Sequence, residues 1–290
     1  MILKEIYRLS ILELKEAGIK TAELDAQVLI CFSLHVSREK FYLKQNDQLS
    51  PAEFKKIKFS IKKRAQNTPV AYILGCKEFY GIDFKVDKNV LIPRPETEHL
   101  VELAFDRIKY YESSIKDKNS LIHDSKYMLL DMGTGCGNII ITLAKNTKGQ
   151  FFAADDSPGA LKIARQNAKL HKVDNKIKFI QSDLFSKLKN QKFNLIIANL
   201  PYVPTSDNNE KSIQFEPKQA IFANNNGTDI IKRFLKDAPN YLFHNGTILL
   251  ELDPRNAIDI ETYAKKYFPN SKIKLSKDLA GFWRYLILES

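Results

Sequence analysis

Residues 127–137 read Tyr127-Met128-Leu129-Leu130-Asp131-Met132-Gly133-Thr134-Gly135-Cys136-Gly137, and a helix is expected to follow from about Asn138. An apolar strand here runs into a turn with three alternating glycines. Glycine lets the backbone approach a ligand closely, and a helix N-terminus presents free N–H groups. A dinucleotide-binding turn has the spacing Gly-x-Gly-x-x-Gly, whereas here the third glycine comes one residue early and an acid stands two residues before the first. The turn therefore favours a nucleoside ligand with an amino-acid end, and a tight turn without a ligand is the alternative.

The next predicted strand, 150–155, ends in Asp155, which lies 24 positions after Asp131. That spacing is close to the roughly 20 positions expected between a glycine turn and the acid that binds a ribose. A carboxylate has two acceptor oxygens and suits two ribose hydroxyls. The alternative role is an N-cap for the following helix. Because Asp156 or Ser157 could cap that helix equally well, Asp155 is expected to be free for a ligand.

Two further predicted strands end in polar residues. Strand 177–181 is followed by Asp183 and Leu184, where the acid could accept from an adenine amine and the leucine could cover the ring; a plain turn is the alternative. Strand 193–198 ends in Asn199-Leu200-Pro201-Tyr202, a tetrapeptide suited to holding a planar amide or amine. Four such strand ends meet at the edge where open α/β sheets bind ligands. A cofactor cradle that presents a methyl donor to an amino-type nitrogen indicates an N-methyltransferase.

The chain is predicted to have three parts. Residues 1–74 carry helical periodicity only, including the capping box Ser50-Pro51-Ala52-Glu53. Residues 79–86 alternate at period two around Gly81 and predict a hairpin, within a hairpin and linker segment at 75–95. Residues 96–290 alternate helices with strands, which indicates a parallel sheet covered on both faces.

Strands are predicted at residues 127–131, 150–155, 177–181, 193–198, 246–251, 271–275 and 283–288. Only a short connection, 278–281, joins the last two, so they should pair antiparallel. The expected fold is an α/β, Rossmann-like sheet that is mostly parallel, with an antiparallel last strand and a small N-terminal helical domain.

The composition bears on where the protein works and on whether it needs a membrane, disulfides or a metal. The 290 residues are 44% hydrophobic, no apolar run approaches the roughly 20 residues that span a bilayer, and the N-terminus has no signal-like segment. Three widely spaced cysteines, Cys31, Cys76 and Cys136, favour neither disulfides nor zinc. We expect a cytoplasmic protein with reduced thiols, no membrane association and no metal.

The net charge of +11 raises the question of a nucleic-acid partner. Most of the 45 basic residues are lysines, which are scattered along the chain. Arginine is better suited than lysine to bidentate recognition of phosphates and bases. We therefore expect no obligatory nucleic-acid partner, with a dedicated nucleic-acid face as the alternative.

The succession of Asp131-x-Gly-Thr-Gly-x-Gly, Asp155-x-Ser-Pro, Ser182-Asp-x-Phe and Asn199-x-Pro-Tyr resembles class I S-adenosylmethionine methyltransferases. The chain also resembles the HemK/PrmC family, which methylates the glutamine of the Gly-Gly-Gln motif in peptide-chain release factors. The resemblance is carried by the helical residues 1–74 and by the segments 92–98, 216–220 and 278–281. The resemblance covers nearly the whole chain. It implies S-adenosylmethionine as cofactor and class-1 release factors as partners, and we favour a monomer.

The resemblance also implies roles for particular residues. The cofactor would be bound by Gly133, Thr134, Gly135, Cys136, Gly137, Asp155, Asp183, Leu184 and Asn199. The substrate amide would be bound and methylated at Asn199, the Leu200 carbonyl, Pro201 and Tyr202.

Some positions depart from the family pattern. Leu200 replaces the first proline of the tetrapeptide, which removes a fixed φ and makes the loop less pre-organised. Asp156 and the segments 225–227 and 251–253 also differ. Two other functions remain open: methylation of adenine amino groups in DNA or RNA, and a cofactor-binding scaffold without turnover.

Overall fold

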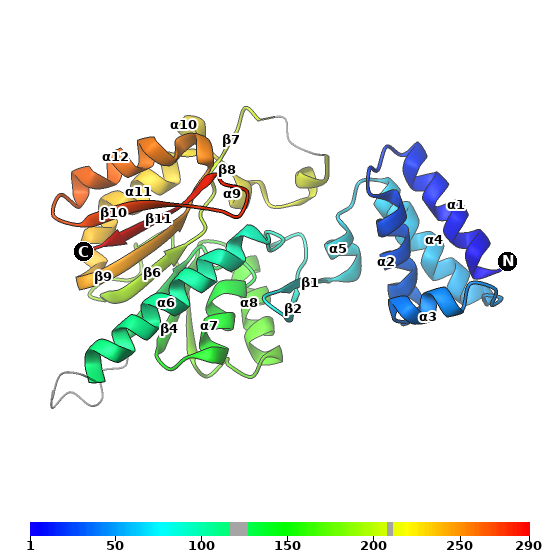
Figure 1. Cartoon of the computed structure of the whole chain (residues 1–290), viewed down its shortest axis with the longest axis horizontal. Coiled ribbons are helices and arrows are strands. Elements are labelled where there is room, and N and C mark those ends of the chain that lie inside the picture. Colours follow the sequence, from blue (N-terminus) through cyan, green and yellow to red (C-terminus); the bar gives the residue numbers. More distant parts are fainter. Residues whose placement is uncertain (117–126, 208–210) are drawn as a thin grey trace. The chain divides into compact units, whose positions relative to one another are not determined.

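The structure is a computed structural model that describes residues 1–116, 127–207 and 211–290 (Figure 1). The described residues divide into two compact units. One comprises residues 1–76 with 211–215, and the other comprises residues 77–116, 127–207 and 216–290. Each unit has its own cluster of buried apolar side chains.

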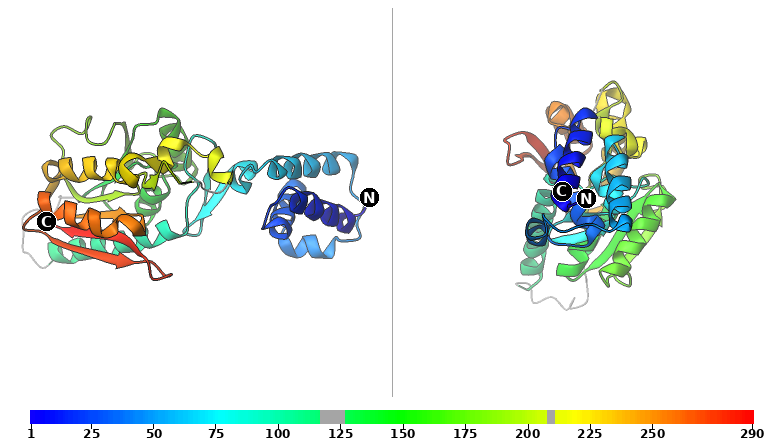
Figure 2. Two further views of the ribbon diagram at one scale, coloured as in Figure 1. Left: turned by 90° about the horizontal axis from the view of Figure 1, so that it is seen from above. Right: turned by 90° about the vertical axis from the view of Figure 1, so that its right-hand side faces the viewer.

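The first unit is helical, and Figure 2 shows its helices packed on one another. Its helices are α1 (Leu3–Glu16), α2 (Ala22–Leu34), α3 (Arg38–Leu43), α4 (Pro51–Ala65) and α5 (Val70–Leu74), together with the 3-10 turn η1 (Lys211–Phe215). The predicted capping box begins α4: the Ser50 hydroxyl accepts from the Glu53 amide at 3.3 Å, and the Glu53 carboxylate accepts from the Ser50 amide at 2.9 Å. Leu3, Leu14, Leu29, Ile30 and Phe41 are completely buried in the core of this unit.

The predicted hairpin is confirmed as a two-stranded sheet of β1 (Cys76–Phe79) and β2 (Ile82–Lys85). Tyr80 and Gly81 connect the strands with φ angles of +52° and +76°. Positive φ at both central residues is typical of the tight turns that join twisted strands.

In the described residues the main sheet has seven strands in the order β10-β11-β9-β6-β3-β4-β5. The parallel strands are β3 (Met128–Met132), β4 (Gln150–Asp155), β5 (Ile177–Gln181), β6 (Phe193–Ala198) and β9 (Leu242–Glu251). The last strand, β11 (Trp283–Glu289), runs antiparallel to both β9 and β10 (Lys272–Lys277). The predicted fold class is therefore confirmed, including the antiparallel last strand.

Helices cover both faces of this sheet (Figure 1). One face carries α6 (Glu96–Lys116), α7 (Asn138–Asn146) and α8 (Pro158–Leu170), and the other carries α11 (Asp229–Asp237) and α12 (Ala257–Tyr267). The central strands are buried on both sides, which explains why they read as continuous apolar runs. None of the helices in the described ranges is long and apolar enough to cross a membrane.

Shorter elements complete the second unit: β7 (Val203–Pro204), α9 (Lys218–Ile221), β8 (Phe222–Ala223), α10 (Asn224–Gly227), η2 (Ala238–Tyr241) and η3 (Pro254–Asn256). Strand register then fixes the functional edge of the sheet. Ala198 pairs with Met132 on one side and with Leu250 on the other. The residues that follow these three, Asn199, Gly133 and Glu251, consequently meet at the carboxyl edge.

Candidate active site

A pocket lies at the carboxyl edge of the sheet and holds about 820 Å³ of empty space, part of it open to solvent. Most of the predicted site residues line it: Gly133, Gly135, Asp155, Asp183, Leu184, Asn199, Leu200 and Pro201. The ends of β3, β4, β5 and β6 therefore converge on one cavity, as the sequence predicted.

The glycine turn forms one wall of this pocket. The amides of Gly133 and Thr134 both donate to the Ala154 carbonyl, at 2.8 and 3.0 Å, which anchors the turn to β4. Gly133 and Gly135 have φ angles of +75° and +55°, in the region that favours glycine. A Cβ added to Gly135 would meet no heavy atom of the described residues within 4 Å. The backbone at Gly135 thus borders open space in which a ligand can lie against it.

Three predicted cofactor residues stand apart from the main pocket. Thr134 and Cys136 line a smaller adjoining cavity. Gly137 is the N-cap of α7, where an added Cβ would lie 2.8 Å from the Ile141 side chain and 3.3 Å from Ala164. Among the described residues Gly137 lines neither cavity, so its contacts serve helix packing.

Asp131 lies beneath the turn and is completely buried. Its Oδ2 accepts from the Thr134 hydroxyl at 2.7 Å, whereas its Oδ1 has no hydrogen-bond partner among the described residues. Burial raises the pKa of Asp131 to about 7, and the nearby Asp155 carboxylate acts in the same direction. An unsatisfied buried carboxylate oxygen is costly, and this one lies under a turn that two cavities border.

Asp155 is held by backbone amides. Gly135 donates to its Oδ2 at 2.8 Å and Ser157 donates to its Oδ1 at 2.9 Å. Ser157 caps α8 by accepting from the Ala160 amide, so Asp155 is not needed as the helix cap. Each carboxylate oxygen can accept a second hydrogen bond, so capacity for ligand hydroxyls remains. Burial raises the pKa of Asp155 to about 6 despite the two amides, which lower it.

Asp183 forms an ion pair that the sequence did not predict. Arg233, on α11, donates to its Oδ2 at 2.8 Å, and both side chains are largely exposed at the rim of the pocket. Asp183 keeps its other oxygen available. Leu184 has a positive φ of 44° and is 8% exposed, which places it in the pocket wall.

The tetrapeptide following β6 presents its asparagine in one orientation. The Asn199 amide nitrogen donates to Thr97 Oγ1 and to Glu251 Oε2, both at 3.0 Å. In the described part of the chain no donor contacts Asn199 Oδ1, and the residue lines both cavities. Asn199 therefore offers a free acceptor at the pocket.

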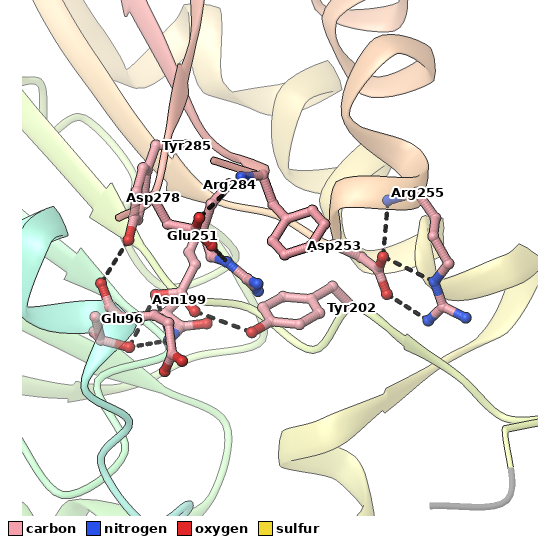
Figure 3. A network of polar contacts seen from close by, with 11 residues as sticks. Glu96, Asn199, Tyr202, Glu251, Asp253, Arg255, Asp278, Arg284 and Tyr285 are labelled. Atoms are coloured by element: carbon pink, nitrogen blue, oxygen red, sulfur yellow. Dashed lines mark hydrogen bonds and ion pairs between the residues drawn. The ribbon is translucent and has the colours of Figure 1, made fainter. Parts of the chain in front are cut away.

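The remaining tetrapeptide residues differ in their surroundings. Leu200 is 4% exposed, and its side chain lies 3.1 Å from the position that a Cβ on Gly133 would take. Tyr202 does not line the main pocket among the described residues; its hydroxyl donates to Glu251 Oε1 at 3.0 Å (Figure 3). Burial, followed by the neighbouring Glu251, raises the pKa of Tyr202 well above its usual value.

Sequence reasoning missed several residues that hold this site together. Glu251 was noted only as a departure from the family, yet it ends β9 and is 1% exposed. The sequence pattern that could have revealed Glu251 is an acid at the end of an apolar strand, which is the pattern that pointed to Asp155. Glu216 accepts from Arg94 at 2.6 Å and from the Ile92 amide at 2.9 Å, which ties the loop before α6 to the segment before α9.

Comparison with known proteins defines the class. Residues 5–75 match the PrmC N-terminal domain and residues 123–271 match a methyltransferase domain. The catalytic domain of hMettl16, solved in complex with the MAT2A 3′UTR hairpin 6, superposes with a TM-score of 0.57 at 15% identity, covering 76% of this chain and 80% of that one. That likeness concerns the fold alone. The protein is a class I methyltransferase that uses S-adenosylmethionine.

Sequence relatives narrow the class to a family. A release factor glutamine methyltransferase of Rhodopirellula baltica is 36% identical over 282 residues, which cover 95% of this chain and 92% of the relative. Another from Coxiella burnetii is 34% identical and covers 92% of each chain. The chain belongs to the release factor glutamine methyltransferase family.

Proposed function

We propose that this protein transfers a methyl group from S-adenosylmethionine to the side-chain amide nitrogen of the glutamine in the Gly-Gly-Gln motif of class-1 release factors. Relatives bearing the name of this activity match over nearly their whole length. The observation that carries the proposal at the site is the orientation of Asn199, whose free Oδ1 borders the pocket while its nitrogen is held by Thr97 and Glu251.

The residues around the pocket fit the cofactor. Open space at Gly135 admits a ligand against the backbone, and Asp155 retains acceptor capacity for ribose hydroxyls. We assign the adenine to Leu184 and the free oxygen of Asp183. The unpartnered Oδ1 of Asp131 supports a cationic or donor group nearby. When bound, S-adenosylmethionine supplies an electrophilic methyl group.

The substrate amide would be held at its two N–H groups. We assign one acceptor to Asn199 Oδ1 and the other to the Leu200 carbonyl. An amide nitrogen is a weak nucleophile because its lone pair is delocalised into the carbonyl. Fixing both protons turns the nitrogen toward the methyl group and favours pyramidalisation as the bond forms. Holding reacting groups in a productive geometry can supply up to about 7–11 kcal/mol of the barrier.

Methyl transfer to the amide nitrogen is a single displacement. The substrate nitrogen would form a bond to the methyl carbon that bound S-adenosylmethionine would supply, with the electron pair of the broken sulfur–carbon bond left on the donor's sulfur. The nitrogen then loses one proton to solvent. No strong base is needed, because the proton becomes acidic once the nitrogen is methylated. Pro201 and Tyr202 would pack beside the glutamine side chain.

We assign residues 1–74 to docking of the release factor, 75–95 to a linker and 96–290 to methyl transfer. The residues that match the PrmC N-terminal domain support a role outside the chemistry, since the proposed site residues all lie in the other unit. We further propose that the protein acts in the cytoplasm on translation termination, as a monomer and without obligatory nucleic acid.

The substrate class can be tested with isotopically labelled S-adenosylmethionine. The protein is offered a release factor and, in separate reactions, adenine-containing DNA and RNA. We expect label in the release factor and background label in the nucleic acids. Label in DNA or RNA with none in the release factor would establish the adenine alternative, and cofactor binding without any transfer would establish a scaffold.

A further inference from the structure

We propose that Glu251 is a positioning residue for methyl transfer: it fixes which end of the Asn199 side-chain amide faces the substrate. The inference rests on the proposed function, since it concerns how the same site holds the glutamine. It assigns a role to an acid that neither lines the pocket nor belongs to the tetrapeptide.

The Glu251 carboxylate is the centre of a network of neutral donors (Figure 3). Its Oε2 accepts from the Thr97 hydroxyl at 2.9 Å and from the Asn199 amide at 3.0 Å. Its Oε1 accepts from the Tyr202 hydroxyl at 3.0 Å. Three elements are thereby joined: the start of α6, the end of β9 and the segment after β6.

The chemistry of a carboxylate makes this arrangement directional. The two ends of a primary amide are alike in shape but opposite in hydrogen bonding, and only the nitrogen can donate. Burial raises the pKa of Glu251, whereas the hydrogen bonds from Thr97 and Tyr202 and the charge of Arg284 lower it. When ionised, the carboxylate only accepts hydrogen bonds, so the Asn199 nitrogen must face Glu251 and the oxygen must face away. If the amide turned over, two oxygens would confront each other in a buried site, which is strongly unfavourable. Glu251 therefore selects the orientation that can accept the substrate's N–H.

The two arginines near Glu251 donate their hydrogen bonds to other carboxylates. Arg284, on β11, donates to Asp278 at 2.9 Å, and Arg255 donates to Asp253 (Figure 3). Each of these arginines thus has its own carboxylate. The direct partners of Glu251 are the two hydroxyls and the Asn199 amide, so its acceptor capacity is spent on orienting the site.

Two substitutions of Glu251 distinguish its role in orienting the Asn199 amide from an effect of its negative charge. In Glu251→Ala all three acceptor contacts are lost, and we expect kcat to fall by about 100-fold, the scale of a misplacement of about 1 Å. In Glu251→Gln the side-chain oxygen can still accept from Asn199 and Thr97, while its nitrogen donates to the Tyr202 hydroxyl. We expect Glu251→Gln to recover most of the rate and both variants to bind S-adenosylmethionine normally in calorimetry.

A matched control lies on the same strand. Thr247, on β9, is buried and hydrogen-bonded to Tyr111, away from the tetrapeptide. Thr247→Val should lower the melting temperature without changing kcat. Should Glu251→Ala fail to fold, Glu251→Met fills the same volume without an acceptor and takes its place.

A double-mutant cycle with Asn199→Ala tests whether Glu251 acts through Asn199. Coupled residues give strongly non-additive effects. We expect Asn199→Ala and the double variant to have the same kcat, because there is no amide left to orient. Additive losses, or an unchanged kcat in folded Glu251→Ala, would overturn the inference. Wild-type protein in the same assay separates the two claims, because its failure to methylate release factor contradicts the proposed function and not the role of Glu251 alone.

Discussion

Asp155 is the residue whose ionisation should control cofactor binding. Burial raises the pKa of Asp155 to about 6 in the free protein, so the group is protonated below that pH. A carboxylate accepts hydrogen bonds from ribose hydroxyls better than a carboxylic acid does. Binding should therefore favour the ionised form, lower this pKa and release protons near pH 6.

We predict that affinity for S-adenosylmethionine rises by up to about tenfold per pH unit as pH increases toward 6 and then levels off. Calorimetry from about pH 5 to about pH 8, in buffers of different ionisation enthalpy, measures both the affinity and the protons released. Asp155→Asn should remove this step, and any remaining dependence near pH 7 would report Asp131, whose pKa burial raises to about 7. A flat affinity profile for the wild type would rule out the assignment of the ribose to Asp155.

Leu200 tests how much pre-organisation the tetrapeptide needs. Its buried side chain packs over Gly133, and burying a leucine contributes about 1.5–3 kcal/mol. Leu200→Pro should lower the melting temperature because part of that burial is lost. It should maintain or raise kcat because proline fixes φ and keeps the backbone carbonyl. A large fall in kcat with intact cofactor binding would show that the leucine side chain itself is required.

At the scale of elements, the glycine turn between β3 and α7 should tolerate no side chain on the pocket side. Gly135→Val puts a β-branched residue at a φ of +55° and fills the space reserved for the cofactor. We predict at least about a tenfold loss of S-adenosylmethionine affinity, equivalent to 1.4 kcal/mol, in calorimetry.

Gly81→Val, in the turn between β1 and β2, is the matched control. Gly81 also has a positive φ and open space around it, but it lies outside the pocket-lining residues. The control should lose stability and keep its affinity. Equal losses of affinity in both variants would mean that backbone strain, and not occlusion of the pocket, is responsible.

The elements could be predicted from sequence because their causes are local. Parallel strands buried on both faces give apolar runs, and Ser50 and Ser157 reveal helix starts through short-range caps. Once the strands were predicted, the four polar strand ends at the carboxyl edge of the sheet could be predicted as well. Partnerships across long separations could not be predicted. Glu251 contacts Thr97, 154 positions away, and Asp183 pairs with Arg233 because α11 crosses the rim of the pocket. Such pairs depend on packing angles that no local pattern encodes.

At the scale of the whole molecule, the two units should separate in function. Each has its own buried core, so a protein beginning at Lys77 should fold. We predict that residues 77–290 bind S-adenosylmethionine with near-normal affinity and lose most methyl transfer to an intact release factor. Circular dichroism and calorimetry supply the folding and binding controls. Full activity on the intact release factor would exclude docking as the role of residues 1–74.

The most direct test of the account is to locate the transferred methyl group. Release factor is incubated with the protein and S-adenosylmethionine, digested, and sequenced by tandem mass spectrometry. We predict one added methyl on the side chain of the Gly-Gly-Gln glutamine, and a strongly reduced yield of it in Asn199→Ala, which still binds the cofactor. A methyl group on any other residue, or an unchanged yield in Asn199→Ala, would contradict the account.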